Sequence, residues 1–300
     1  MATTIIFGFD METDVGSWTP FYEGLVRGTP RILEVLERHA VSATFFFTGD
    51  AARTHPQIVK LIQRAGHEVG CHSLYHETVG DELFEIPGIK PILREEVFHR
   101  TEVATDIVQQ AFGAKVVSYR APRLFGSTAL LNALEKLGYL ADASYPMYYY
   151  KDRLAPYHPS DRDWTAEGSM NILEIPNFAD MTIESKDPCG RDRDQWPLFR
   201  TEGAEALVAH VDNMIAHLRA KNLPAVLCFY MHPWEFHQMP QGPIHFGEGT
   251  VIPDPFIVKN CGKYALDQLD RLIEMLKERG ARFVGAGDLA KEEGRRGQRV

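Results

Sequence analysis

Two histidines four residues apart, His72 and His76, are the residues of this chain that most clearly suggest chemistry. They follow a short segment typical of a β-strand, and four residues make about one helical turn, so both rings would face one point if a helix began there. Two imidazoles and one carboxylate are the ligands of a catalytic zinc site that keeps a position open for water. Asp10 and Glu12, at the end of the first predicted strand, supply carboxylates on one face.

Strand-like and helix-like segments alternate along almost the whole chain and would have to bring these side chains together. Strands are predicted at 4–9, 42–47, 67–71, 116–119, 139–142, 171–175, 225–231 and 281–284. Amphipathic helices are predicted at 30–40, 56–65, 93–112, 128–137, 202–220 and 264–279. Alternation with short links implies parallel strands, and about eight repeats favour a closed (β/α) barrel in a single catalytic domain, 1–300.

In such a barrel the chemistry lies at the carboxyl ends of the strands. Polar residues stand at five of the predicted ends: Asp10 and Glu12, His72 and His76, Arg120, Asp142, and His232. Each residue has an ordinary structural explanation by itself, but their shared position indicates one site. Three residues at the same ends are candidate substrate contacts: Pro122, Tyr145 and Trp234.

Composition excludes several classes of partner. Acids outnumber bases by 41 to 32, which gives a formal charge of -9 without a basic stripe, so we expect no nucleic acid or anionic membrane partner. No apolar run approaches the ~18 residues that span a bilayer. The sequence starts without a secretory leader and its four cysteines show no CxxC spacing, so we expect reduced thiols and a cytoplasmic location.

Three stretches lack a clear period: 145–168, 178–200 and 234–263. Long irregular loops in a compact domain are usually functional. We expect them to close a pocket or to bury a subunit interface.

The motifs, in their order along the chain, resemble those of the polysaccharide deacetylase family, also called carbohydrate esterase family four. The matching segments are Phe9-Asp10-Met11-Glu12, Ala43-Thr44-Phe45-Phe46, Gly66-His67-Glu68-Val69-Gly70 with His72 and His76, Arg120-Ala121-Pro122, and His232-Pro233. The family's commonest first motif has two adjacent aspartates, whereas this chain is more similar to a branch with an Asp-x-Glu pattern and no signal peptide. The resemblance implies a distorted barrel with seven or eight mainly parallel strands.

The resemblance also assigns roles to the metal-binding and basic groups. It implies that Glu12, His72 and His76 hold a divalent transition metal, for which Zn2+ suits the two imidazoles and one carboxylate. Asp10 would be the general base, and Arg120 would pair with it and keep it ionised.

His232 would protonate the leaving nitrogen, because an amide anion is a very poor leaving group. A carboxylate should lie behind His232 and raise its pKa. Asp142 is the first candidate and Asp180 the second.

Three functions stay open at this point. The first is metal-dependent hydrolysis of a non-peptide C–N bond, as N-deacetylation of an N-acetylated sugar or glycan. The second is hydrolysis of a small cyclic amide by a cytosolic enzyme similar to the allantoinase and cyclic imidase branch. The third is a non-catalytic carbohydrate-binding barrel. A long groove would favour a glycan, and a closed pocket of a few hundred Å3 a small molecule. The resemblance further suggests a homo-oligomer.

Overall fold

The computed structural model describes residues 3–297, so the two ends of the predicted 1–300 domain lie outside the described part. Its described residues form an eight-stranded sheet around the central strand β1 (Thr4–Met11). Every pairing in this sheet is parallel. The other strands are β2 (Thr44–Phe47), β3 (Glu68–Cys71), β4 (Ser118–Tyr119), β5 (Ala141–Asp142), β6 (Leu173–Glu174), β7 (Val226–Met231) and β10 (Arg282–Phe283).

The sheet curls back on itself into a distorted barrel. Strands β1 to β6 follow one another in chain order, and β7 pairs with the other edge of β1. Just after β6, Asn177 forms a parallel bridge with Cys228 of β7, and the backbone N–H of Phe178 donates to the Cys228 carbonyl at 2.7 Å. The predicted barrel of seven or eight mainly parallel strands is therefore confirmed.

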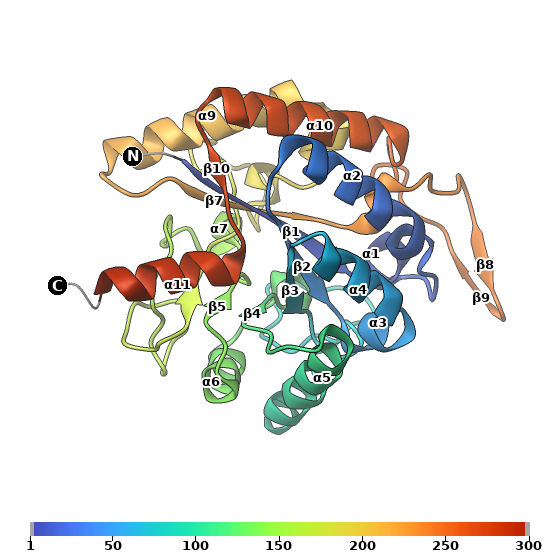
Figure 1. Cartoon of the computed structure of the whole chain (residues 1–300), viewed down its shortest axis with the longest axis horizontal. Coiled ribbons are helices and arrows are strands. Elements are labelled where there is room, and N and C mark those ends of the chain that lie inside the picture. Colours follow the sequence, from blue (N-terminus) through green and yellow to red (C-terminus); the bar gives the residue numbers. More distant parts are fainter. Residues whose placement is uncertain (1–2, 298–300) are drawn as a thin grey trace.

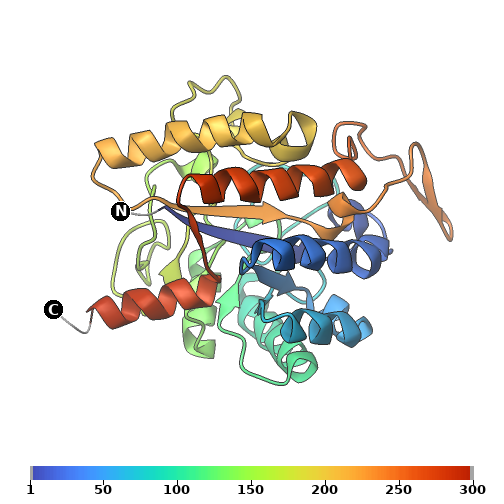
Figure 2. The ribbon, with the colours of Figure 1, turned by 45° about the horizontal axis from the view of Figure 1, so that its top comes forward.

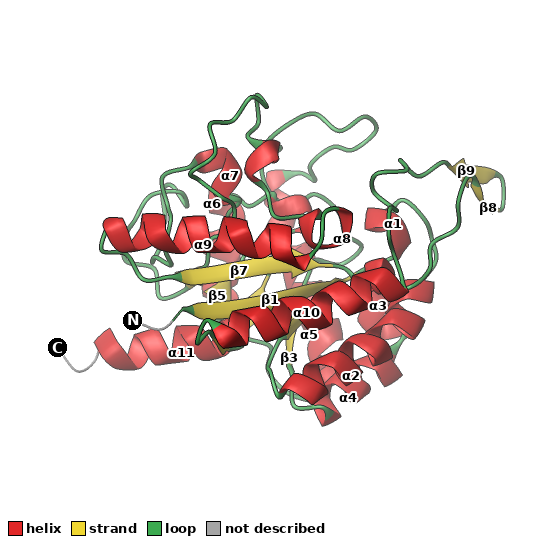
Figure 3. Ribbon diagram, turned by 90° about the horizontal axis from the view of Figure 1, so that it is seen from above, coloured by secondary structure: helices red, strands yellow, loops and turns green. Residues whose placement is uncertain are grey.

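Helices cover the outside of the sheet, and β1 and β7 lie between them (Figures 1, 2 and 3). The longer ones are α2 (Thr29–His39), α4 (Pro56–Arg64), α5 (Val97–Phe112), α6 (Thr128–Leu137), α9 (Ala204–Ala220), α10 (Lys263–Glu278) and α11 (Ala286–Gly297). Shorter ones are α1 (Asp14–Ser17), η1 (Gly24–Gly28), α3 (Gly49–Thr54), η2 (Arg94–Glu96), η3 (Pro122–Leu124), α7 (Met147–Tyr150), η4 (Arg191–Arg193), α8 (Leu198–Thr201) and η5 (Pro233–Phe236). None of the described helices is long and apolar enough to cross a membrane.

Strand β1 is buried along its whole length, as expected of a parallel strand covered on both faces. Phe9 of β1 stacks on Phe45 of β2, with ring centroids 4.9 Å apart. The same burial encloses Asp10, so its charge requires a partner inside the protein.

A two-stranded antiparallel hairpin, β8 (Ile244–Phe246) and β9 (Gly249–Val251), projects from the body of the molecule (Figure 1). It belongs to the third irregular stretch, 234–263, and does not join the barrel sheet. The hairpin was not expected from the sequence.

Candidate metal centre and active site

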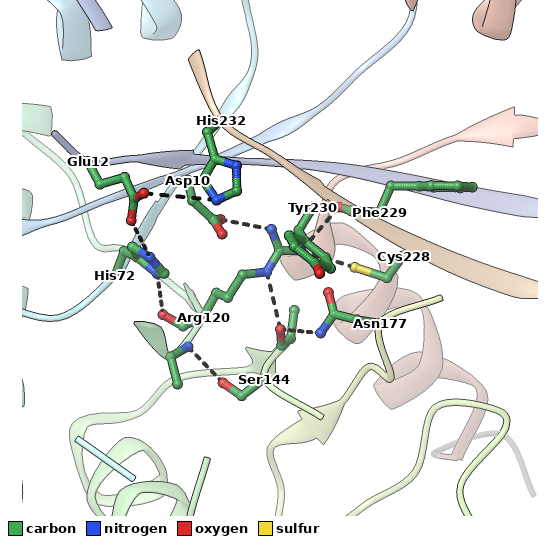
Figure 4. Close-up of polar contacts among 12 residues, drawn as sticks. Asp10, Glu12, His72, Arg120, Ser144, Asn177, Cys228, Phe229, Tyr230 and His232 are labelled. Atoms are coloured by element: carbon green, nitrogen blue, oxygen red, sulfur yellow. Dashed lines mark hydrogen bonds and ion pairs between the residues drawn. The ribbon is translucent and has the colours of Figure 1, made fainter. Parts of the chain in front are cut away.

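Glu12, His72 and His76 lie together at the carboxyl ends of β1 and β3. One ligand atom from each falls within 4.8 Å of the others, and all three side chains are buried. Glu12 Oε2 is 2.5 Å from His76 Nε2 and 3.6 Å from His72 Nε2. Figure 4 shows the Glu12 and His72 side chains pointing toward each other. The two segments thus meet as the sequence predicted.

The two histidines converge by a different route from the expected helix. The residues after His72 form a tight loop in which Ser73 and His76 have φ values of 67° and 61°. The Glu77 carboxylate holds this loop by accepting hydrogen bonds from Ser73 Oγ at 3.1 Å and from the Tyr75 backbone at 2.6 Å. Left-handed backbone at non-glycine residues is costly and persists where surrounding contacts fix it. No helix begins directly after His72, and the two rings meet through this loop instead.

The unpaired atoms of this cluster fit a cation. His72 Nδ1 lies 2.7 Å from the Arg120 carbonyl oxygen, so Nδ1 carries the proton and Nε2 presents its lone pair to the cluster. His72 Nε2 and both Glu12 carboxylate oxygens are buried without a hydrogen-bond partner among the described residues. Buried polar atoms normally have partners, and a divalent transition metal would satisfy all three.

The protonation states also suit a cation. Burial raises the pKa of Glu12, but His76, His72 and His232 together bring it well below its usual value. Burial lowers the pKa of His76 more than Glu12 raises it. The site therefore offers a carboxylate and a neutral imidazole, which are the forms that bind metal ions.

Asp10 is paired with Arg120, as expected. Arg120 Nη1 lies 2.9 Å from Asp10 Oδ1, and the guanidinium is fully buried (Figure 4). Arg120 also donates to the carbonyl oxygens of Ala143 and Phe229, at 3.2 and 3.3 Å. These contacts fix the guanidinium and hence the Asp10 carboxylate.

Gly8 makes room for this ion pair and was not singled out in the sequence. A Cβ atom at Gly8 would lie 2.3 Å from Arg120 Nη1. The available signal was a glycine inside an apolar strand, which often marks a close approach of another group.

The carboxylate behind His232 is Glu235. Glu235 Oε1 lies 3.0 Å from His232 Nδ1 and accepts from the His232 backbone N–H at 2.8 Å. Its other oxygen accepts from Arg200 Nε at 2.7 Å, and Trp196 Nε1 donates to Oε1 at 3.0 Å. The predictions of Asp142 and Asp180 for this position were wrong. The usable signal was an acid three residues after the histidine, within one turn of η5.

The two rejected acids have other partners. Asp142 accepts from Ser144 Oγ at 2.7 Å and is buried beside Glu174. Burial raises the pKa of Asp142 to about 6, and burial together with the Asp142 charge raises that of Glu174 well above its usual value. Asp180 Oδ2 lies 2.8 Å from His210 Nδ1.

The pKa of His232 is raised although the ring is buried. Burial lowers it, but the hydrogen bond to Glu235 and the charges of Glu12, Glu235 and Asp10 outweigh that effect. Burial also acts to raise the pKa of Glu235, yet Arg200 and His232 bring it down to about 2. His232 Nε2 lies 3.9 Å from Glu12 Oε1, on the side of the metal ligands. The ring is therefore able to carry a proton into the site.

A cavity of about 280 Å3 opens onto Asp10, Glu12, His76 and His232. Trp234 lines it, as predicted, but Pro122 and Tyr145 do not. Tyr145 is fully buried, and its hydroxyl accepts from the Arg153 backbone N–H. Aromatic rings and two arginines make up much of the remaining wall: Trp18, Phe84, Trp196, Tyr230, Arg123 and Arg191.

Comparisons with known proteins agree with this site. The polysaccharide deacetylase family profile matches residues 13–141 of this chain, a stretch that includes His72, His76 and Arg120. The chitooligosaccharide deacetylase of Azorhizobium caulinodans is 28% identical over 146 residues, which are 48% of this chain and 59% of that protein. The Bacillus subtilis peptidoglycan-N-acetylmuramic acid deacetylase PdaA is 30% identical over 112 residues, which are 37% of this chain and 39% of that one.

This chain thus covers less than two thirds of the length of these curated relatives. Among solved structures, Puue allantoinase superposes with a TM-score of 0.62 at 16% identity, over 97% of this chain and 90% of that one. At that identity the likeness concerns the fold alone.

Proposed function

We propose that this protein is a metal-dependent hydrolase of a non-peptide C–N bond and that it removes the acetyl group from an N-acetylated sugar. The observation that carries the proposal is the buried cluster of Glu12, His72 and His76. The Asp10 and His232 side chains lie on the wall of the same cavity. The deacetylase names of two relatives support a carbohydrate as the substrate class.

Zinc is the cation that we propose for the cluster, because two imidazoles and one carboxylate are ligands that it commonly takes at catalytic sites. A divalent cation held there supplies Lewis acidity, which lowers the pKa of water and polarises a carbonyl oxygen. Glu12, His72 and His76 would hold it.

Asp10 is the proposed general base. It removes a proton from the water that adds to the acyl carbon, and the bond to Arg120 directs its carboxylate. Arg120 is fixed in turn by the carbonyls of Ala143 and Phe229, so that the base is positioned before substrate binds.

His232 is the proposed general acid. Its proton passes from Nε2 to the amide nitrogen as the C–N bond breaks, which releases an amine and a carboxylate. Glu235 accepts from Nδ1–H, fixes the orientation of the ring and favours its charged form.

A second candidate function is hydrolysis of a small cyclic amide, and the size of the cavity favours it. At about 280 Å3 the cavity lies at the small end of the range for ligand sites and suits a single ring better than a long glycan. An N-acetylated sugar substrate would accordingly present one residue at a time. The two functions share the same chemical groups and differ in the molecule that enters.

Product analysis separates these functions. Zinc-loaded protein is incubated with N-acetylglucosamine, with short chitooligosaccharides and with hydantoin, and released acetate or ring-opened product is measured. We expect turnover of one class, reduced on the order of 10²–10⁴-fold in Asp10→Asn. His67→Ala, at a histidine outside the metal cluster, is the control that keeps activity. Absence of all turnover in metal-loaded protein would favour the carbohydrate-binding barrel.

A further inference from the structure

Two arginines line the cavity, Arg123 and Arg191, and two more contact residues of its wall, Arg120 and Arg200. Among the described residues, three of these four are paired with a carboxylate. The matched pairs are Arg120 with Asp10 at 2.9 Å, Arg200 with Glu235 at 2.7 Å, and Arg191 with Asp194 at 3.1 Å. Arg123 lines the same cavity and forms no ion pair with any described residue. A largely buried charge without a counter-charge is costly, which makes Arg123 a candidate for binding an anion.

Arg123 is held rigidly beside the metal ligands. Its Nη1 donates to the His76 carbonyl oxygen at 2.9 Å and to Thr78 Oγ1 at 3.2 Å. Both acceptors are neutral. Its backbone lies in the left-handed region, with φ of 61°, and the following Leu124 has φ of 59°. Strained backbone of this kind gathers at ligand sites, where the surrounding contacts fix it.

The remaining donors of Arg123 are free to bind a ligand. A guanidinium carries five N–H donors in a planar fork that matches a carboxylate with two parallel hydrogen bonds. Nε and Nη2 have no acceptor among the described residues. The Arg123 side chain is only partly exposed to water.

We propose that Arg123 binds a carboxylate of the substrate, so that the preferred substrate is an amide carrying an anionic group on the part that enters this cavity. The inference rests on the proposed function and narrows its substrate class. The acids beside the other three arginines neutralise them, so Arg123 contributes a positive charge that has no counter-charge. A divalent cation bound by Glu12 would leave a second net positive charge in the same cavity. Such a cavity attracts anions and concentrates them at the site.

Matched pairs of neutral and acidic compounds test this proposal. N-acetylmuramic acid adds a carboxylate-bearing ether to the ring of N-acetylglucosamine, and hydantoin-5-acetic acid adds a carboxymethyl group to hydantoin. We expect kcat/KM of the zinc-loaded protein to favour the acidic member of the hydrolysed pair by about 10–100-fold, the value of a charged hydrogen bond. Arg123→Gln should reduce this ratio to near one, and Arg123→Lys should retain part of it.

The ratio separates substrate binding from a structural role, because a displaced His76 loop would reduce both members of a pair equally. Arg53→Gln is the matched control: it removes the same charge from an exposed residue of α3 that does not line the cavity, and should leave the ratio unchanged. Equal kcat/KM for both members in the wild type, or an unchanged ratio in Arg123→Gln, would overturn the proposal.

Calorimetry on the zinc-loaded protein keeps the inference testable if no compound is hydrolysed. Tighter binding of the acidic members than of the neutral ones, lost in Arg123→Gln, would support the anion site while the proposed hydrolysis failed. Equal affinities would reject the anion site regardless of any turnover.

Discussion

His232 lies between two acids that have different effects. Glu235 contacts Nδ1 at 3.0 Å and is anchored by Arg200, whereas Glu12 lies 3.9 Å from Nε2 among the metal ligands. Only the first contact orients the ring without competing for a metal. We therefore attribute the acid role of His232 chiefly to Glu235, at three residues' distance in the chain.

Replacing Glu235 by glutamine should change the pH profile. The pKa of His232 is raised, so its proton is present at low pH and is lost as pH rises through that pKa. An amide at position 235 supports the charged ring less well, so the alkaline limb of kcat/KM should move to lower pH. At pH values above the shifted limb, kcat/KM of the variant should be lower than that of the wild type by the contribution of a general acid, on the order of 10²-fold or more.

The pH dependence of kcat/KM in Glu235→Gln is the measurement, with Asp180→Asn as a control. Asp180 is a buried acid with its own histidine partner, His210, and its replacement should leave the limb in place. If the alkaline limb of kcat/KM stays in place in Glu235→Gln, or moves equally in Asp180→Asn, Glu235 does not set the pKa of His232.

Strand β1 and the residue after it carry both the proposed base, Asp10, and a proposed metal ligand, Glu12, and Gly8 of the same strand leaves space for the Arg120 side chain. Gly8→Ala would put a Cβ atom 2.3 Å from Arg120 Nη1. Because a buried ion pair broken on one side costs on the order of 3–5 kcal/mol, we expect a loss of stability of that size and a large loss of kcat.

Urea unfolding and steady-state kinetics measure both effects of Gly8→Ala. Gly294→Ala in helix α11 is the control, because a Cβ atom at Gly294 would have nothing within 4 Å and alanine favours a helix. An active and fully stable Gly8→Ala protein would show that Arg120 does not depend on this space.

The ends of β5 and β6 hold two neighbouring acids, Asp142 and Glu174. Their pKa values are raised in the folded protein, so the folded state binds an extra proton and stability falls as pH rises from about 4 through 6 and above. Glutamine at 174 keeps an oxygen for the Ser144 and Tyr145 backbone N–H groups and can donate to Asp142. Glu174→Gln should therefore flatten this decline.

Urea midpoints between pH 5 and pH 9 measure the decline in wild type and in Glu174→Gln. Glu135→Gln, at a partly exposed acid that binds the Asn171 side chain, is a control that should keep the wild-type slope. If stability falls equally with pH in Glu174→Gln and in the wild type, Asp142 and Glu174 do not bind the extra proton.

At the scale of the whole molecule, most of the barrel was predictable because buried parallel strands are apolar runs between amphipathic helices. The bridge from Asn177 to Cys228 closes the barrel by joining an irregular segment to strand β7. The hydrophobic periodicity of the sequence does not predict this contact. The expected cytoplasmic location and homo-oligomer stay predictions.

The site was predictable where it depends on strand ends and less so where it depends on loops. Glu12, His72 and Arg120 lie at or just beyond strand ends, whereas the position of His76 depends on a left-handed loop that Glu77 holds. The cavity wall draws on the stretch 178–200 through Arg191 and Trp196, and on 234–263, but on no residue of 145–168. The length of an irregular stretch does not show which of its residues line a cavity.

The metal content of the purified protein shows whether the cluster of Glu12, His72 and His76 binds a cation. Protein purified without chelator is analysed for transition metals and then titrated with zinc by calorimetry, alongside Glu12→Gln, His76→Ala and the control His67→Ala. We predict about one zinc per chain in the wild type and in His67→Ala, with strongly reduced binding in the other two variants. Wild-type protein that takes up no metal, or Glu12→Gln and His76→Ala variants that bind it as well as wild type, would show that this cluster is not a metal site.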